Sequence, residues 1–195
     1  MNNIEHIFIF DIDGCIMKSI FPNIHDNDQD RDQIIKEVNE YGKTISLFSD
    51  FIHYYKLHCT KHSLVFFITG RQDKPFRALT EYQLRPLQTI KPYFLVFYPL
   101  NKEHTAIQYF QWKVNMIFSI FKLFQSIKNI IFHIFDDMVD YFDSLRIIVK
   151  SMDLTCHLHN IYKNDQWQDL NRKHKKESLF LNTLFRQKKK NMDQV

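Results

Sequence analysis

Glycine is the residue that this chain of 195 residues uses least freely, because it has only three. Average usage would supply roughly 14 in a chain of this length. A protein so poor in glycine is expected to keep it where no other residue can turn or approach as closely. The three are Gly14, Gly42 and Gly70, whereas Phe occurs 19 times. The ordinary shares of apolar (45%) and charged (25%) residues exclude collagen-like and low-complexity chains.

Cysteine and long apolar runs are also scarce. The three cysteines form no Cys-x-x-Cys pair, and no histidines stand at zinc-finger spacing, so a disulfide scaffold and a zinc knuckle are excluded. The apolar run at the N-terminus is short and ends in acidic residues, unlike a signal peptide, and no stretch of 18 apolar residues occurs. We therefore expect a cytoplasmic protein without a transmembrane segment, which leaves export by a non-classical route open.

Positive charge is concentrated at the C-terminal end. The net charge is +4, but residues 169–195 alone carry +5 and residues 1–168 carry −1. We therefore predict a main domain over 1–168 and a basic helix or tail over 169–195. Three interpretations of the tail stay open: a helix docked on the core, a surface for a nucleic-acid backbone, and an amphipathic segment on a membrane surface.

Short apolar runs alternate with segments of helical spacing along residues 1–168. The predicted strands are 4–10, 63–68, 93–98, 130–135 and 154–158, and the predicted helices are 27–58 (broken at Gly42), 74–89, 103–126, 138–149 and 169–189. Alternation of this kind is typical of an α/β fold, and continuous apolar strands fit a parallel sheet that is buried on both faces. The sequence therefore predicts a doubly wound parallel sheet.

Polar residues stand where three of these strands end: Asp11, Thr69 and the pair Asp136–Asp137. In doubly wound sheets, ligands bind beyond the carboxyl ends of the strands. Several carboxylates gathered there would repel one another unless a cation offsets their charge, and ligands that are all oxygen favour Mg²⁺. The alternative is that each aspartate only caps a helix.

Four segments in order resemble the motifs of the haloacid dehalogenase-like superfamily. They are IFIFDIDGCI (7–16), FFITGR (66–71), Lys113 within YFQWKVNMI, and IIFHIFDDMVD (130–140). The resemblance covers about residues 4–160 and implies a Rossmann-like core. Within the superfamily, TGR followed by Arg77 and Thr80 is similar to the phosphatase domains of polynucleotide kinase–phosphatase enzymes.

The resemblance implies a role for each matching side chain. Asp11 would be the nucleophile that forms an aspartyl-phosphate, and Asp13 would be the general acid and then the general base. Thr69 would hydrogen-bond a phosphoryl oxygen, and Lys113 would neutralise charge on the phosphoryl group. Mg²⁺ would bind the side chains of Asp11 and Asp137 and the backbone carbonyl of Asp13.

Further positions follow from the same resemblance. Gly14 would permit the tight turn after the acid, while Gly70 and Arg71 would lie against the phosphate of the substrate. Asp136 and Asp140 would act as alternative metal ligands or support the metal indirectly. Two other lysines, Lys122 and Lys128, compete with Lys113 for the motif lysine, although both are also explained as surface charges.

The intervals between the motifs are filled by predicted helices and one strand, which leaves little or no room for a cap domain; residues 15–30 would form at most a small flap. An open site accepts phosphate on a large molecule. The sequence thus predicts a Mg²⁺-dependent phosphatase acting on a macromolecule, either a phosphoprotein (including phosphotyrosine) or a nucleic-acid phosphate end. The alternatives are a non-catalytic phosphate-binding module and a phosphotransferase or phosphomutase. The physiological substrate and the oligomeric state stay open.

Overall fold

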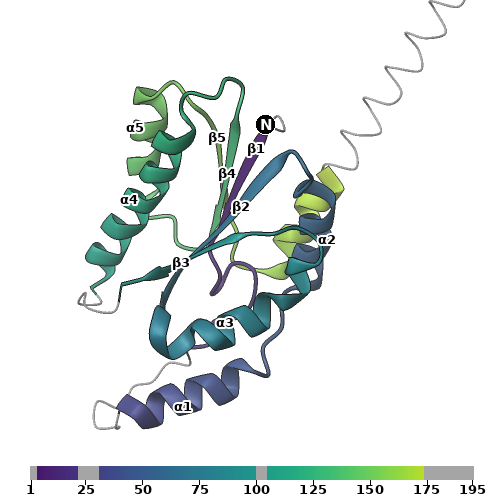
Figure 1. The fold of residues 1–195 in the computed structure, drawn as a ribbon, viewed down its shortest axis with the longest axis vertical. Coiled ribbons are helices and arrows are strands. Elements are labelled where there is room, and N and C mark those ends of the chain that lie inside the picture. The colour runs from purple at the N-terminus through teal and green to yellow at the C-terminus, as the bar shows by residue number, and fades with distance from the viewer. Residues whose placement is uncertain (1–3, 22–30, 100–104, 174–195) are drawn as a thin grey trace, which may run out of the picture.

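A parallel β-sheet between helices organises the chain (Figure 1), and the computed structural model describes residues 4–21, 31–99 and 105–173. Within these residues the sheet has five strands in the order β3-β2-β1-β4-β5. The strands are β1 (His6–Phe10), β2 (Ser63–Gln72), β3 (Phe94–Tyr98), β4 (Ile131–Asp136) and β5 (Thr155–Asn160). The helices are α1 (Arg31–Gly42), α2 (Ser49–His58), α3 (Asp73–Gln88), α4 (Ala106–Phe124) and α5 (Phe142–Ser151).

The central strand β1 shows why the strands are apolar at consecutive positions. It pairs in parallel with β2 on one side and with β4 on the other, so neither of its edges is open to solvent. Phe8 and Phe10 belong to the hydrophobic cluster on one face, and Ile7 and Ile9 belong to the cluster on the opposite face. Burial on both faces explains the unbroken IFIF run.

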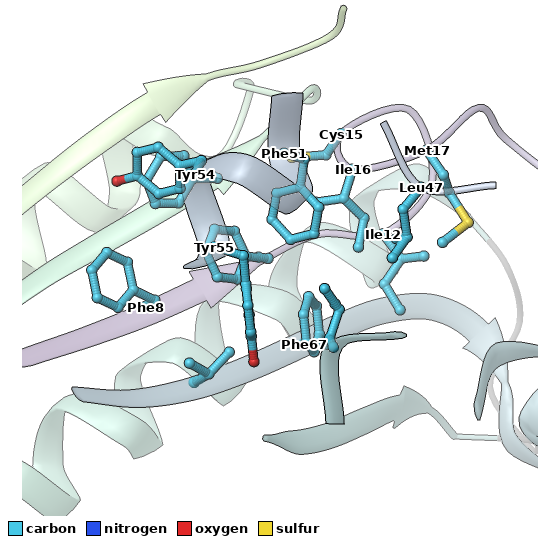
Figure 2. Close-up of a cluster of buried hydrophobic side chains, with 14 of the residues drawn as sticks. Phe8, Ile12, Cys15, Ile16, Met17, Leu47, Phe51, Tyr54, Tyr55 and Phe67 are labelled. Carbon is cyan, nitrogen blue, oxygen red and sulfur yellow. The ribbon is translucent and has the colours of Figure 1, made fainter. Parts of the chain in front are cut away.

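Helices cover both faces of the sheet. On one face, α2 supplies Phe51, Tyr54 and Tyr55, which lie over Phe8 and Phe67 of the strands (Figure 2). On the opposite face, α4 and α5 pack through a set of large apolar side chains: Trp112, Ile117, Ile120, Phe121, Phe142 and Leu145. The helix α1 lies outside this arrangement and packs on α3. The α/β fold with a doubly wound parallel sheet is therefore confirmed.

Most predicted elements occur within a few residues of their expected positions, including the break at Gly42, where α1 ends. Several boundaries differ by more, among them the start of α2 at Ser49 and not directly after Gly42. The strand β2 continues to Gln72 instead of ending at Ile68, with a shift of its register against β3 between Thr69 and Gln72. The helix α5 begins at Phe142 instead of 138.

The C-terminal prediction is only partly covered by the structure. Residues 164–173 are helical and run across the predicted boundary between 168 and 169. Trp167 of this helix is fully buried in the core. The remainder of the predicted helix over 169–189, and residues 22–30 of the predicted flap, lie outside the described residues. None of the described helices combines the length and the apolar character that a membrane crossing needs.

Candidate active site

The carboxyl ends of β2, β1 and β4 meet at one edge of the sheet, because these strands are parallel neighbours. Phe10 pairs with Phe67 on one side and with Phe135 on the other, so the residues that follow lie level with one another. The backbone N–H of Asp11 donates to the carbonyl of Phe135 over 2.9 Å, which continues the ladder by one residue. The predicted site residues of β1 and β4 therefore come together.

Three carboxylates cluster at this edge. Asp11, Asp136 and Asp137 each offer an oxygen, and these oxygens all lie within 4.8 Å of one another. Asp11 and Asp136 are buried. Burial, and then the negative charge of Asp136, raises the pKa of Asp137 to about 6. A cation would relieve this repulsion, and ligands that are all oxygen suit Mg²⁺. The cluster is able to hold a metal ion.

Lys113 reaches the cluster from α4. Its Nζ donates to Oδ1 of Asp11 over 2.6 Å and also forms an ion pair with Asp136. Although burial alone would lower the pKa of Lys113, the two aspartates raise it well above its ordinary value, so the side chain stays charged. By contrast, Lys122 and Lys128 are exposed. The structure thus places Lys113, and not the other two candidates, beside Asp11.

The carboxylate of Asp13 is bound by Arg71. The guanidinium holds the carboxylate by two bonds, from Nε to Oδ2 over 2.7 Å and from Nη2 to Oδ1 over 2.9 Å. Nη1 of Arg71 donates to Thr80 and Gln83, and the whole side chain is buried. Arg71 was expected to lie against substrate phosphate, but its polar atoms are bonded within the protein. We infer that it positions Asp13.

Buried side chains anchor the turn that carries Asp13 and Gly14. Ile12, Cys15, Ile16 and Met17 have no exposed surface, and they belong to the same hydrophobic cluster as Leu47 and Phe51 (Figure 2). Nε1 of Trp167 donates to the carbonyl of Cys15 over 2.9 Å. The turn is therefore fixed by the core on both sides of the carboxylate.

Steric crowding explains why glycine occupies positions 14 and 70 at the site. Gly14 has a φ of +82°, and a Cβ there would lie 2.2 Å from Oδ2 of Asp137. A side chain would thus strain the backbone and displace a carboxylate of the cluster. At Gly70, a Cβ would lie 3.1 Å from the ring of Tyr109. The absence of a side chain at 70 lets this ring approach the end of β2.

Thr69 was expected to reach the substrate phosphate, but it is not among the described residues that line the cavity at this edge. It is fully buried in β2, and its Oγ1 accepts a hydrogen bond from the backbone N–H of Arg71 over 3.2 Å. Its neighbour Gly70 does line this cavity. A hydrogen bond from Thr69 to a phosphoryl oxygen stays a prediction.

A cavity of about 710 Å³ opens over the carboxylates. Asp11, Asp13 and Asp137 contribute to its lining. Phe21, Phe76 and Tyr109 add aromatic surface, and Arg31 adds a positive charge. A phosphoryl group is small compared with this volume, so the cavity has room for much of the group that carries it.

The sequence did not identify Tyr109 as a site residue, and it gave Asp136 too small a part. Tyr109 lines the cavity and accepts a hydrogen bond from Lys113, and burial raises the pKa of its hydroxyl, which stays protonated. Its position four residues before Lys113, on the same face of a helix, is a signal that could have identified it. Asp136, expected only as an alternative or indirect ligand, belongs to the cluster itself and accepts hydrogen bonds from Tyr141 and the N–H of Met138.

Comparisons with known proteins found distant structural similarity. No family model matches the chain, and no curated protein matches it. A chain of a Pnkp1/Rnl/Hen1 complex is similar in structure, with a TM-score of 0.46 and 16% identity over 82% of this chain and 47% of its own. A chain of the Pnkp1/Rnl/Hen1 RNA repair complex gives 0.44 and 16% over 80% and 43%.

The present chain therefore spans less than half the length of these two structural neighbours. Their similarity is too low to carry an argument about what this chain does. Membership of the haloacid dehalogenase-like superfamily stays a prediction from the four sequence motifs.

Proposed function

We propose that this protein is a Mg²⁺-dependent phosphatase that hydrolyses a phosphomonoester on a macromolecule through an aspartyl-phosphate. The observation that carries the proposal is the placement of Asp11. Its carboxylate lines an open cavity, Nζ of Lys113 lies 2.6 Å from Oδ1, and two further carboxylates are beside it. A carboxylate held by a cation and open to a cavity on one side is suited to nucleophilic attack.

The first step transfers the phosphoryl group to the protein. An oxygen of Asp11 forms a bond to phosphorus while the bond from phosphorus to the leaving oxygen breaks. Asp13, which also lines the cavity, first takes up a proton from solvent and then gives it to the leaving oxygen. Lys113 offsets negative charge on Asp11 and on the phosphoryl group throughout.

The second step releases phosphate. Asp13 takes a proton from a water molecule as the oxygen of that water attacks phosphorus, and the bond to Asp11 breaks. Asp11 returns as a carboxylate. Asp13 thus acts twice, and the two hydrogen bonds from Arg71 keep it in one orientation for both steps.

A magnesium ion would be held by Asp11, Asp136 and Asp137, whose carboxylates fit it in charge and donor type. The contribution of the backbone carbonyl of Asp13 stays a prediction. When bound, the ion supplies positive charge that stabilises the phosphoryl oxygens.

An open cavity supports a large substrate. Within the described residues, no second domain lies between the end of β1 and the end of β4, where α1, α2, β2, α3, β3 and α4 occupy the sequence. Nucleic-acid phosphate ends and phosphoproteins both fit this arrangement. The basic segment 169–195 would suit contact with a nucleic-acid backbone or a membrane surface, beside the alternative of a helix docked on the core.

The test is phosphate release by the purified full-length protein from p-nitrophenyl phosphate, with Mg²⁺ and with EDTA. We expect turnover that requires the metal. A phosphotyrosine peptide and a 3′-phosphorylated oligonucleotide are then compared as substrates. If none of the three releases phosphate, the proposal fails, and binding of phosphate analogues without turnover would support the non-catalytic module.

Arg71→Lys tests the orientation of Asp13. A lysine keeps the charge but cannot make two parallel bonds to one carboxylate, so Asp13 loses its fixed direction. We expect kcat on p-nitrophenyl phosphate to fall about 10- to 100-fold, with a smaller change in KM. Arg85→Lys, at an exposed position of α3, is the matched control and should retain wild-type kcat. An unchanged kcat in the folded Arg71 variant would contradict the positioning role.

A further inference from the structure

The hydroxyl of Tyr109 occupies a place in the site that the four motifs do not assign. It lies 3.0 Å from Nζ of Lys113 and 3.4 Å from Oδ1 of Asp11, and Tyr109 lines the cavity. A lysine ammonium only donates hydrogen bonds. The oxygen of Tyr109 therefore accepts from Lys113, and its single proton is directed at the carboxylate of Asp11.

The ring of Tyr109 is held in place by aromatic neighbours. Tyr98 meets it edge-on with the ring centres 5.8 Å apart, and Trp112 stacks with it at 5.9 Å. Gly70 faces the ring, and any side chain there would push against it at 3.1 Å. The hydroxyl is thus fixed by packing before substrate arrives, which is the condition for a donor to stabilise developing charge.

We propose that Tyr109 is a further catalytic residue, whose hydroxyl donates to Asp11 at rest and to a phosphoryl oxygen during transfer. This inference rests on the proposed phosphatase activity. As an oxygen of Asp11 bonds to phosphorus, the carboxylate loses its negative charge and becomes a weaker acceptor. The phosphoryl oxygens beside it retain negative charge, so the hydrogen bond moves to one of them. Tyr109 keeps its proton and forms no covalent bond.

The substitution Tyr109→Phe removes only the hydroxyl and retains the ring that Tyr98 and Trp112 contact. We expect kcat on p-nitrophenyl phosphate to fall about 10- to 100-fold, because one preorganised donor is lost. Tyr82→Phe makes the same chemical change at an exposed position of α3 and should retain wild-type kcat. Thermal unfolding of both variants checks that they fold.

Inhibition separates a catalytic role from a packing role. Vanadate imitates the phosphoryl group in transfer, so its inhibition constant should rise in Tyr109→Phe by about the factor by which kcat/KM falls. The inhibition constant of inorganic phosphate should change less than threefold. Equal shifts for the two inhibitors, or an unchanged kcat beside an active wild type, would overturn the inference. An inactive wild type would instead overturn the proposed function, and this inference with it.

Discussion

Asp11→Asn is expected to lower phosphate release from p-nitrophenyl phosphate by a factor on the order of 10⁴ or more. An asparagine has no carboxylate oxygen to attack phosphorus, so no aspartyl-phosphate forms. The amide is also nearly the same size as the carboxylate, and the cavity keeps its shape. Loss on this scale in a folded protein separates a nucleophile from a residue that only binds the substrate.

The fold of the Asp11 variant is expected to survive. Lys113 keeps its ion pair with Asp136, and one negative charge is removed from a crowded cluster. The thermal midpoint in EDTA should therefore equal or exceed that of the wild type. Asp153→Asn is the matched control, since it is exposed and lies before the amino end of β5, away from the site. Wild-type turnover in Asp11→Asn would refute the mechanism.

Mass spectrometry of the phosphorylated protein identifies the nucleophile independently of mutagenesis. Acid quenching of the wild type during turnover should trap a phosphoryl group on the peptide that contains Asp11. A phosphoryl group found on another residue would contradict the role of Asp11 as nucleophile, even if Asp11→Asn were inactive.

Lys113→Met is expected to lower the free energy of unfolding by about 3–5 kcal/mol, measured by urea unfolding in EDTA. Methionine fills much of the space of the lysine stem but leaves Asp11 and Asp136 buried without their cation. Lys122→Met is the control on the same helix. Because Lys122 is exposed, its replacement should change stability by less than about 0.5 kcal/mol.

The double variant Lys113→Met with Asp136→Asn tests the cause of that loss. Removal of one unpaired buried charge should recover part of the stability that Lys113→Met loses. In the wild type, the hydroxyl of Tyr141 donates to Asp136, and the amide oxygen of the replacement side chain can still accept this hydrogen bond. A double variant less stable than Lys113→Met would show that packing of the lysine stem, and not charge, accounts for the loss.

The sequence by itself determined the sheet and the edge at which the site lies. A strand buried on both faces must be apolar at every position, so the first polar residue marks where the strand leaves the core. Asp11 and Asp136–Asp137 were identified on that basis, and the structure brings them together. The same rule misplaced the end of β2, because Thr69 is polar yet buried within the strand.

Only the tertiary structure decided which side chains meet. Arg71 and Asp13 are 58 residues apart, and Lys113 and Asp11 are 102 apart. Whether such pairs touch depends on the register of the strands and on how α4 is rotated about its axis, and neither quantity is encoded in local spacing. For that reason the sequence left three lysines open, did not pair Arg71 with Asp13 and overlooked Tyr109. Packing of α4 against the sheet brings Lys113 and Tyr109 to Asp11.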